Sequence, residues 1–264
     1  MNKVKAVNIS VVGASGRMGG RVLAMASQDP RFFVVAGVEA PKHESIGHFT
    51  ADGKAPIVGN IEEVLYKTDV AIDFTSPQST LETARQVAQK GRALVVGTTG
   101  LKPAEVKKLK DYARRIAIVF SPNMSVGMNL LFELVKRAAA TLPQYDIEIV
   151  EAHHNKKKDA PSGTAMKLAE IAAEASNRSS SDFVFGRKGL VGPRTKKEIG
   201  IMSLRAGDIV GDHTVLISNI GERLELTHRA HSRDALALGA LDAAYWVARR
   251  RPGLYSMADV LGFK

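Results

Sequence analysis

The fold of this chain is decided near its start by the stretch Val7-Asn8-Ile9-Ser10-Val11-Val12-Gly13-Ala14-Ser15-Gly16-Arg17-Met18-Gly19. Its first six residues are mostly apolar and β-branched, a pattern that predicts a buried strand. The glycines Gly13, Gly16 and Gly19 allow a tight turn, close approach of a pyrophosphate to the backbone, and close packing of a following helix on the strand. We therefore expect a strand, a glycine turn and a helix whose N-terminus holds the phosphates of a dinucleotide.

A second apolar run, from Phe32 to Val38, ends in the carboxylate of Glu39. Glu39 lies 20 residues after Gly19, the position from which an acidic side chain reaches the ribose hydroxyls of the adenosine. Strand, turn, helix, strand and acid thus occur in the order of a dinucleotide-binding unit. This order predicts cofactor contacts from both the turn and Glu39.

Strands and helices alternate through the next part of the chain. Residues 40–60 show no periodicity and predict a surface loop, followed by a short helix at 61–66. Further strands are expected at residues 70–74, 93–96 and 116–120. This alternation is typical of an α/β fold with a doubly wound parallel sheet of Rossmann type, which binds ligands at the carboxyl ends of its strands. Two such ends are Gly97-Thr98-Thr99 and Ser121-Pro122-Asn123-Met124, although ordinary turns can have similar sequences.

The pattern changes after an apolar helix expected at residues 128–142. Strands without intervening helices are then expected at residues 199–205, 214–219 and 222–227. They indicate a second, α+β domain with an antiparallel or mixed sheet. The helix at 234–249 could return to the first domain, so we place the second domain at residues 125–234 and the first at 1–124 and 235–264. Residues 177–194 are expected to be a mobile, solvated excursion.

The densest concentration of reactive groups is the stretch Glu151-Ala152-His153-His154-Asn155-Lys156-Lys157-Lys158-Asp159-Ala160-Pro161-Ser162-Gly163-Thr164-Ala165. An alternating strand at 145–150 should deliver both histidines at its carboxyl end. Pro161 fits the first turn of a helix, which would leave the Ser162-Gly163-Thr164 segment at a helix N-terminus able to hold an anion. Histidine titrates near neutral pH, and a lysine of lowered pKa can act as an acid. Together these groups predict a reaction centre for an anionic substrate that must be protonated.

Two plainer interpretations of this stretch are a metal site and a solvated surface. Adjacent side chains on a strand point to opposite faces, so His153 and His154 are not expected to share a metal ion, and no metal site is expected. The run from Lys156 to Lys158 can also be a solvated surface, as most lysine runs are. The combination with histidines and a helix start favours the reaction centre.

The composition limits the remaining possibilities. A chain of 264 residues with 45% hydrophobic and 24% charged residues is ordinary for a soluble globular protein. Its net charge of +10 raises the question of nucleic acid, but the basic residues are scattered over several expected helices, and only five Tyr and one Trp could stack on bases, so no nucleic-acid partner is expected. The absence of cysteine excludes disulfides and thiol nucleophiles. No apolar run reaches transmembrane length, and residues 1–6 do not open an apolar leader, so we expect a cytoplasmic protein without a membrane partner.

The sequence resembles the family of 4-hydroxy-tetrahydrodipicolinate reductases, also called dihydrodipicolinate reductases, of the diaminopimelate route to lysine. The resemblance runs nearly end to end, and the 151–165 stretch is its most specific part. The other matching segments are Val12 to Gly19, Ile72-Asp73-Phe74-Thr75, Gly97 to Gly100, Asn123 to Gly127 and Arg205 to Gly211.

The resemblance implies reduction of 4-hydroxy-tetrahydrodipicolinate, a small dicarboxylate, to tetrahydrodipicolinate. Hydride would come from NADH or NADPH in the first domain, and a proton from His153 or Lys157 in the second, which would also form a homotetramer. His154, Gly163 and Thr164 match the substrate-binding positions of the family. The implied cofactor contacts are Gly13, Ala14, Ser15, Gly16, Arg17, Met18, Glu39, Gly97, Thr98, Thr99, Ser121, Pro122, Asn123 and Met124.

The loop after Glu39 bears on the choice between the two cofactors. Many family members that use NADPH well follow this acid with an arginine, which can pair with the 2′-phosphate. Here Glu39 is followed by Ala40 and Pro41, so we expect NADH to be preferred or both cofactors to be used. Lys42 and His43 lie close enough in sequence to supply a charge.

Two other functions are compatible with the same fold. One is a reductase of another cyclic imine or oxo acid. The other is a non-catalytic NAD(P)H sensor, which would have no use for a His-His-x-x-Lys cluster beside a helix N-terminus.

Overall fold

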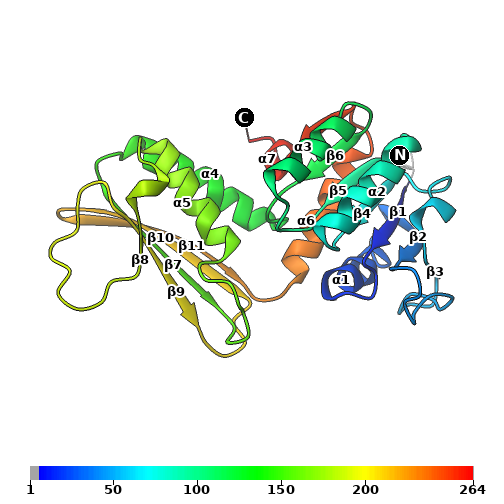
Figure 1. Ribbon diagram of the computed structural model, residues 1–264, viewed down its shortest axis with the longest axis horizontal. Coiled ribbons are helices and arrows are strands. Elements are labelled where there is room, and N and C mark those ends of the chain that lie inside the picture. Colours follow the sequence, from blue (N-terminus) through cyan, green and yellow to red (C-terminus); the bar gives the residue numbers. More distant parts are fainter. Residues whose placement is uncertain (1–5, 264) are drawn as a thin grey trace. The chain divides into compact units, whose positions relative to one another are not determined.

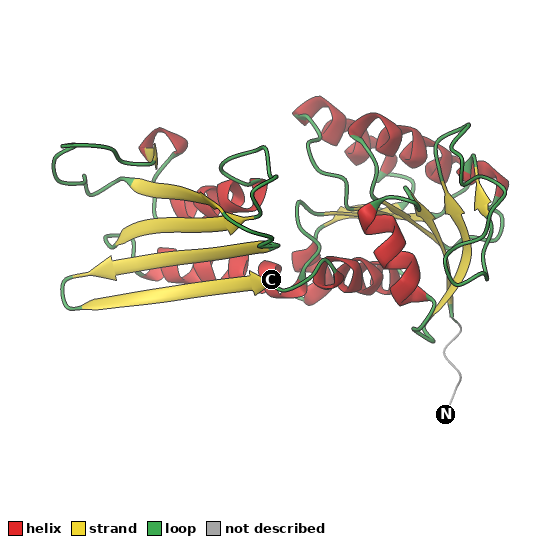
Figure 2. Cartoon of the chain, turned by 90° about the horizontal axis from the view of Figure 1, so that it is seen from below, coloured by secondary structure: helices red, strands yellow, loops and turns green. Residues whose placement is uncertain are grey.

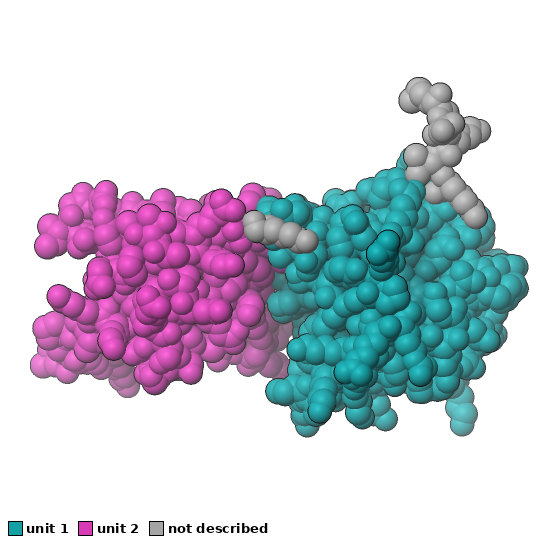
Figure 3. Space-filling model, turned by 90° about the horizontal axis from the view of Figure 1, so that it is seen from above, with its two compact units in different colours: residues 1–126, 233–264 teal, residues 127–232 magenta. Residues whose placement is uncertain are grey.

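The computed structural model describes residues 6–263, which form two compact units (Figure 3). Unit 1 comprises the residues up to Val126 together with those from Arg233 onward, and unit 2 comprises Gly127–Ser232. The whole of unit 2 is therefore inserted in the chain of unit 1. The expectation about a leader concerns residues 1–6, of which all but Ala6 lie outside the described residues.

Unit 1 is built on a sheet that has seven strands within residues 6–263. The strands are β1 (Val7–Val12), β2 (Phe32–Val38), β3 (Ile57–Val58), β4 (Val70–Asp73), β5 (Ala93–Val96), β6 (Ala117–Phe120) and β12 (Gly253–Tyr255). The helices are α1 (Arg17–Ala26), η1 (Ile61–Glu63, a 3-10 turn), α2 (Pro77–Gln89), α3 (Pro103–Tyr112), α6 (Asp234–Val247) and α7 (Met257–Leu261). The strand order is β12-β6-β5-β4-β1-β2-β3, and all neighbours are parallel (Figure 1). The doubly wound Rossmann-type sheet expected from the sequence is confirmed.

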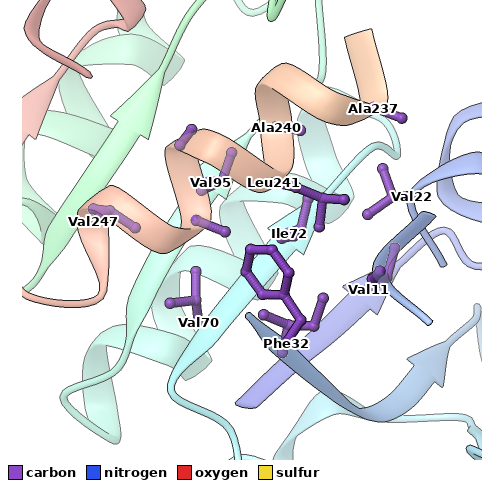
Figure 4. Close-up of a cluster of buried hydrophobic side chains, with 14 of the residues drawn as sticks. Val11, Val22, Phe32, Val70, Ile72, Val95, Ala237, Ala240, Leu241 and Val247 are labelled. Atoms are coloured by element: carbon purple, nitrogen blue, oxygen red, sulfur yellow. The ribbon is translucent and has the colours of Figure 1, made fainter. Parts of the chain in front are cut away.

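Helices cover both faces of this sheet, as Figure 2 shows. On one face α1 and α6 bury a cluster that includes Leu241 and Val247 of α6 together with Ile72 and Val95 of the central strands (Figure 4). On the other face α2 and α3 bury a second cluster. These central strands are apolar on both sides, as a parallel sheet between two helical layers requires.

The short elements of unit 1 differ from expectation. The region 40–60 is not loop throughout, because β3 lies in it and pairs with β2. The helix expected at 61–66 is only the three-residue turn η1. At the opposite edge, β12 pairs with β6 and was not expected. Strands of two or three residues show no periodicity, which is why the sequence pattern missed them.

The register of the sheet brings its functional loops to one edge. Val12 lies beside both Val38 and Asp73, and Val96 lies beside both Asp73 and Phe120. Each of these residues ends its strand. The loops that leave this edge begin at Gly13, Glu39, Phe74, Gly97 and Ser121.

Unit 2 holds a mixed sheet of five strands within the described residues. The strands are β7 (Asp146–His153), β8 (Phe183–Phe185), β9 (Ile199–Arg205), β10 (Gly211–Asn219) and β11 (Glu222–Ala230), and the helices are α4 (Val126–Thr141), α5 (Gly163–Ala175) and the 3-10 turn η2 (Ser180–Asp182). The order is β11-β10-β7-β9-β8; β7, β8 and β9 are parallel to one another, and β10 is antiparallel to both of its neighbours, β7 and β11 (Figure 1). Helices α4 and α5 share a core with the sheet that includes Leu131, Ile149, Leu168 and Val215.

The segment 177–194 is more regular than the sequence indicated. It contains η2 and β8, and β8 extends the sheet beside β9. Its basic residues are not simply solvated, because Arg187 donates to Glu148 at 2.8 Å and also pairs with Glu198. The partners lie outside the segment, so its own composition could not reveal them.

Candidate functional site

Close backbone contacts shape the glycine turn after β1. Gly13 has a φ of +81°, and a Cβ there would lie 2.7 Å from the carbonyl oxygen of Phe74. A Cβ on Gly19 would lie 2.0 Å from the carbonyl oxygen of Gly13. Helix α1 starts at Arg17 with Gly16 as its N-cap, and among the described residues no side chain caps this end. The first-turn N–H groups are thus available to an anion, as in dinucleotide-binding turns.

Side chains of the turn differ in exposure. Ala14 is buried against the sheet, whereas Ser15 and Arg17 are exposed and Met18 is half-buried. Ser15 reaches the acid expected to bind ribose, since its backbone N–H donates to Glu39 Oε1 at 2.6 Å. The expected turn and acid are therefore adjacent.

A cavity of about 710 Å³ opens beside this pair. It is lined by residues that include Gly13, Ser15, Glu39, Ala40, His43 and Thr75. Its volume is in the range of small-molecule sites, and the glycine turn and the carboxylate fit the pyrophosphate and ribose of a dinucleotide. Lys42, with a φ of +73°, is not among the described residues that line it.

A buried carboxylate joins the loops that follow β4 and β5. Asp73 Oδ1 accepts from the Thr75 N–H at 3.1 Å and from Thr98 Oγ1 at 2.9 Å. Thr80 Oγ1 lies 2.9 Å from the same oxygen. Burial raises the pKa of Asp73, although these hydrogen bonds oppose the shift. Asp73 thus holds Thr98 in place while the neighbouring Thr99 is exposed.

The remaining cofactor positions lie on the next two loops of the same edge. A Cβ on Gly97 would lie 2.1 Å from the ring of Phe74, so this glycine allows the ring to pack against the loop. In the loop after β6, Ser121 Oγ donates to the carbonyl of Asn123 at 2.8 Å. Pro122 is exposed, whereas Met124 is buried in the core of unit 1. Met124 can therefore offer a cofactor its backbone but not its side chain.

In unit 2, Glu151 and His153 lie on one face of β7. Residues two apart on a strand share a face, and this face carries Ile147 and Ile149 in the core before it becomes polar. Glu151 Oε2 lies 2.6 Å from His153 Nδ1. Burial alone would raise the pKa of Glu151, but hydrogen bonds from Arg205 and His153 outweigh it and lower this pKa to about 2. Burial lowers the pKa of His153, and Glu151 opposes that shift.

The lysine run is not uniform. Lys157 is half-buried, and its Nζ lies 2.9 Å from both carboxylate oxygens of Asp159. Its charge is close enough to lower the pKa of His153. Lys156 and Lys158 are exposed. The structure therefore separates Lys157 from its neighbours and brings it toward the histidine.

Helix α5 begins beside these groups. Ser162 is its N-cap and accepts from the Ala165 N–H, so Pro161 precedes the helix and does not occupy its first turn as expected. Gly163 is exposed, and nothing described lies within 4 Å of where its Cβ would be. Gly163 and Thr164 thus lie in the first turn of the helix, a position that favours anions.

His154 and His213 have different environments from His153. His154 follows the end of β7 and accepts from the Lys157 N–H through its carbonyl at 3.1 Å. His213 is buried on β10, with its ring 5.3 Å from that of His153, and burial lowers its pKa to about 4. Its Nε2 lies 3.2 Å from Ser162 Oγ. Among residues 6–263 no three His, Cys, Asp or Glu side chains are grouped to hold a metal ion.

Both halves of the chain match models of one protein family. Residues 7–124 match the description "Dihydrodipicolinate reductase, N-terminus" and residues 127–261 match "Dihydrodipicolinate reductase, C-terminus". The chain belongs to the dihydrodipicolinate reductase family. No helix in the described part of this family member combines the length and apolar character needed to span a membrane.

The curated relatives to which this dihydrodipicolinate reductase family member is similar share the same protein name. A protein from Desulfotalea psychrophila is 50% identical over 97% of this chain and 98% of its own length, and one from Syntrophus aciditrophicus is 46% identical over 96% and 98%. Both are named 4-hydroxy-tetrahydrodipicolinate reductase. A solved structure, dipicolinate-bound dihydrodipicolinate reductase from Paenisporosarcina sp. TG-14, is 25% identical with a TM-score of 0.81, covering 97% of this chain and 99% of that one.

Sequence reasoning gave no role to four charged or titratable residues of this dihydrodipicolinate reductase family member. They are Asp73, Glu151, Arg205 and His213. Three of them, Asp73, Glu151 and Arg205, fall inside segments that resemble the family, but some of their partners are remote in sequence: Arg205 is 54 residues from Glu151. Only the register of the strands brings such pairs together.

Proposed function

We propose that this protein reduces 4-hydroxy-tetrahydrodipicolinate to tetrahydrodipicolinate with NADH or NADPH, in the diaminopimelate route to lysine. The observation that carries the proposal is the buried His153 with Lys157 and the first turn of α5 beside it. This grouping joins a proton source to an anion site. The dipicolinate held by the Paenisporosarcina relative is a flat dicarboxylate of the expected kind.

In unit 2, each group has a distinct task in the proposed reaction. The N–H groups of Gly163 and Thr164 hold one carboxylate of the substrate, helped by the dipole of α5. His154 binds the substrate beside them. His153 and Lys157 supply the proton, and Lys157 adds a positive charge that attracts the dicarboxylate.

In unit 1, the residues of the sheet edge bind and orient the cofactor. A bound nicotinamide dinucleotide supplies the hydride. The turn from Gly13 to Met18 holds its pyrophosphate, and Glu39 accepts hydrogen bonds from the adenosine ribose. The loops 97–99 and 121–124 orient its nicotinamide end. With Ala40 and Pro41 after the acid, NADH is preferred or both cofactors are used.

Self-association and location complete the proposal. The resemblance to the family supports a homotetramer built through unit 2 and a cytoplasmic enzyme without nucleic-acid or membrane partners. Light scattering coupled to gel filtration measures the assembly directly, and the mass of four chains is expected.

The function is tested by following the oxidation of NADH and NADPH with freshly prepared 4-hydroxy-tetrahydrodipicolinate. We expect cofactor oxidation that depends on this substrate. A reductase of another cyclic imine or oxo acid would instead turn over only with that compound, and a sensor would bind the cofactor without turnover.

A further inference from the structure

Glu151 is a fully buried acid that links the candidate proton donor to an arginine. Its side chain is 0% exposed. Arg205 makes a two-pronged contact with it, through Nη1 to Oε2 at 2.9 Å and Nη2 to Oε1 at 2.8 Å. The N–H of Ser162 donates to Oε1 at 3.1 Å, and His153 Nδ1 lies 2.6 Å from Oε2. Both oxygens are thus satisfied by directed contacts.

The strands of unit 2 fix this arrangement. In the parallel pairing of β7 and β9, His153 lies beside Arg205 and Glu151 lies beside Ser203, which also hydrogen-bonds Glu151. On the other side, the antiparallel register with β10 sets Glu151 opposite His213. Arg205 is held in turn, because its guanidinium donates to the carbonyls of Leu204 at 2.6 Å and Asp159 at 2.5 Å. Glu151 therefore cannot turn away from His153 without breaking several contacts.

We propose that Glu151 is a positioning residue for His153. It holds the Nδ1–H of the ring, so that the protonated ring gives its other proton, on Nε2, to the substrate and the neutral ring keeps its hydrogen on Nδ1. Arg205 keeps Glu151 charged. The inference rests on the proposed function. An ionised carboxylate only accepts hydrogen bonds, so the nitrogen facing it must carry the hydrogen. The orientation resembles that of metal-bound or catalytic histidines held by a carboxylate.

Protons and electrons balance in the resulting step. The doubly protonated ring of His153 gives its Nε2 proton to the substrate as hydride from the reduced nicotinamide adds to the unsaturated carbon. The substrate gains two hydrogens, a proton from His153 and a hydride that leaves the nicotinamide oxidised, and its ring hydroxyl is lost as water in forming tetrahydrodipicolinate. His153 remains neutral, with its Nδ1–H still hydrogen-bonded to Glu151. Solvent then restores the Nε2 proton. Gly211 leaves room at this nitrogen, since a Cβ there would lie 3.1 Å from Nε2.

The other charges around His153 act in the opposite direction. Lys157 and Arg205 lower its pKa, and Asp159 is engaged by Lys157. His213 lies against it from β10 and, buried, is neutral at physiological pH. Glu151 is therefore the group that favours the protonated ring of His153. Its removal should lower kcat mainly in the pH range in which the ring loses its proton.

The test combines Glu151→Gln with nitrogen-15 NMR of labelled histidine and with pH profiles of kcat. In the unchanged protein, His153, assigned by comparison with His153→Gln, should show the Nδ1–H tautomer at alkaline pH. In Glu151→Gln the amide can donate to Nδ1, so the tautomer should become Nε2–H. The kcat should fall about tenfold or more above neutral pH and recover at acidic pH, where the ring is fully protonated. A purely structural role would lower kcat equally at every pH.

Glu148→Gln is the matched control, because Glu148 also lies on β7 and pairs with an arginine, Arg187, away from His153. It should leave the tautomer and the profile unchanged. An Nε2–H tautomer in the unchanged protein, or an unaltered tautomer and profile in Glu151→Gln, overturns the inference. If Glu151→Gln does not fold, Arg205→Lys should shift the pH profile of kcat in the same direction, and the absence of a shift would overturn the inference. Absence of turnover in the unchanged protein would defeat the proposed function while leaving the tautomer measurement valid.

Discussion

At the scale of single residues, Lys157 stands apart from the lysines on either side. Its side chain is only 21% exposed, whereas Lys156 and Lys158 are exposed. Replacing Lys157 by Ala removes a charge and a candidate acid at the reacting centre, so kcat should fall by roughly 10²–10⁴ in steady-state assays. Lys156→Ala and Lys158→Ala serve as controls. Equal, small losses at all three positions would mean that the run is a solvated surface after all.

Ala40 is the residue at which we expect a substitution to change cofactor preference. It lines the cavity beside Glu39, and the structure gives Lys42 no place among the described lining residues. Ala40→Arg adds a guanidinium that can pair with a 2′-phosphate, so kcat/KM should rise for NADPH relative to NADH. The kcat/KM values for NADPH and for NADH are compared with those of Ala40→Gln, a variant with a longer side chain but no charge. A tenfold or larger preference of the unchanged enzyme for NADPH, about 1.4 kcal/mol, would contradict this view of the loop.

Residues of the site could be predicted when their partners were close in sequence. His153, Lys157 and the start of α5 fall within one short stretch, so the sequence alone predicted their proximity. Arg205 could not be assigned to Glu151, because strand register and not spacing along the chain brings them together. The burial of Met124 was also hidden, since the segment 121–124 reads as an ordinary turn.

At the scale of elements, the loops after β4 and β5 depend on each other through Asp73. Thr98→Val removes a hydroxyl that donates to Asp73 and accepts from the Thr75 N–H at 2.9 Å. Asp73 and the Thr75 N–H would each lose one buried hydrogen bond, so the free energy of unfolding should fall by about 1–3 kcal/mol in urea titrations. The exposed Thr99 offers the control, since Thr99→Val should change the free energy of unfolding by less than about 0.5 kcal/mol. Similar values for both variants would show that the Asp73 contacts do not support the edge.

Elements were predictable in proportion to their length and pattern. β1, β2, β5 and β9 have the bounds that their apolar runs indicated. β3, β8 and β12 are edge strands of two or three residues that depend on a neighbour already in place. Pro161 was assigned to a helix because proline is common at that position, but the capping hydroxyl of Ser162 moves the start of α5 beyond it.

At the scale of the whole molecule, buried titratable groups of unit 2 make stability depend on pH. Burial lowers the pKa of His213 from 6.5 to about 4, so between these values the unfolded chain binds a proton that the folded chain does not. Its contribution is intact above pH 6.5 and is lost as pH falls to 4, by up to about 3 kcal/mol. Glu151, with a pKa lowered from 4.5 to about 2, adds a further loss below pH 4.5.

We therefore expect the free energy of unfolding of the unchanged protein to fall steadily from pH 6.5 downward. In denaturant titrations, His213→Gln should make the free energy of unfolding depend less on pH between 6.5 and 4. Replacing the exposed His48 by Gln should leave this dependence unchanged. Identical slopes for the two variants would rule out His213 as the source.

The proposed dicarboxylate contacts lie in unit 2, and the proposed dinucleotide contacts lie in unit 1. Pyridine-2,6-dicarboxylate should therefore bind the cofactor-free protein and inhibit competitively with the substrate. Isothermal titration calorimetry should show much weaker binding to the variant that combines Thr164→Val and Lys157→Ala. Ala40→Arg, changed only in unit 1, is the control, and equal affinity in the double variant would mean that the site is elsewhere.

The insertion of unit 2 within unit 1 sets an order of events on the ribosome. The first six strands of unit 1 are synthesised early, but α6, which covers one face, and β12, which pairs with β6, are made only after unit 2. At roughly 5–20 residues per second, the nascent sheet waits several seconds with the part of this apolar face that lies under α6 uncovered and the edge of β6 unpaired. Unit 2, one continuous segment, can fold in that interval. The part of the protein that is translated first is thus completed last, and it is the part most exposed to aggregation and to chaperones during synthesis.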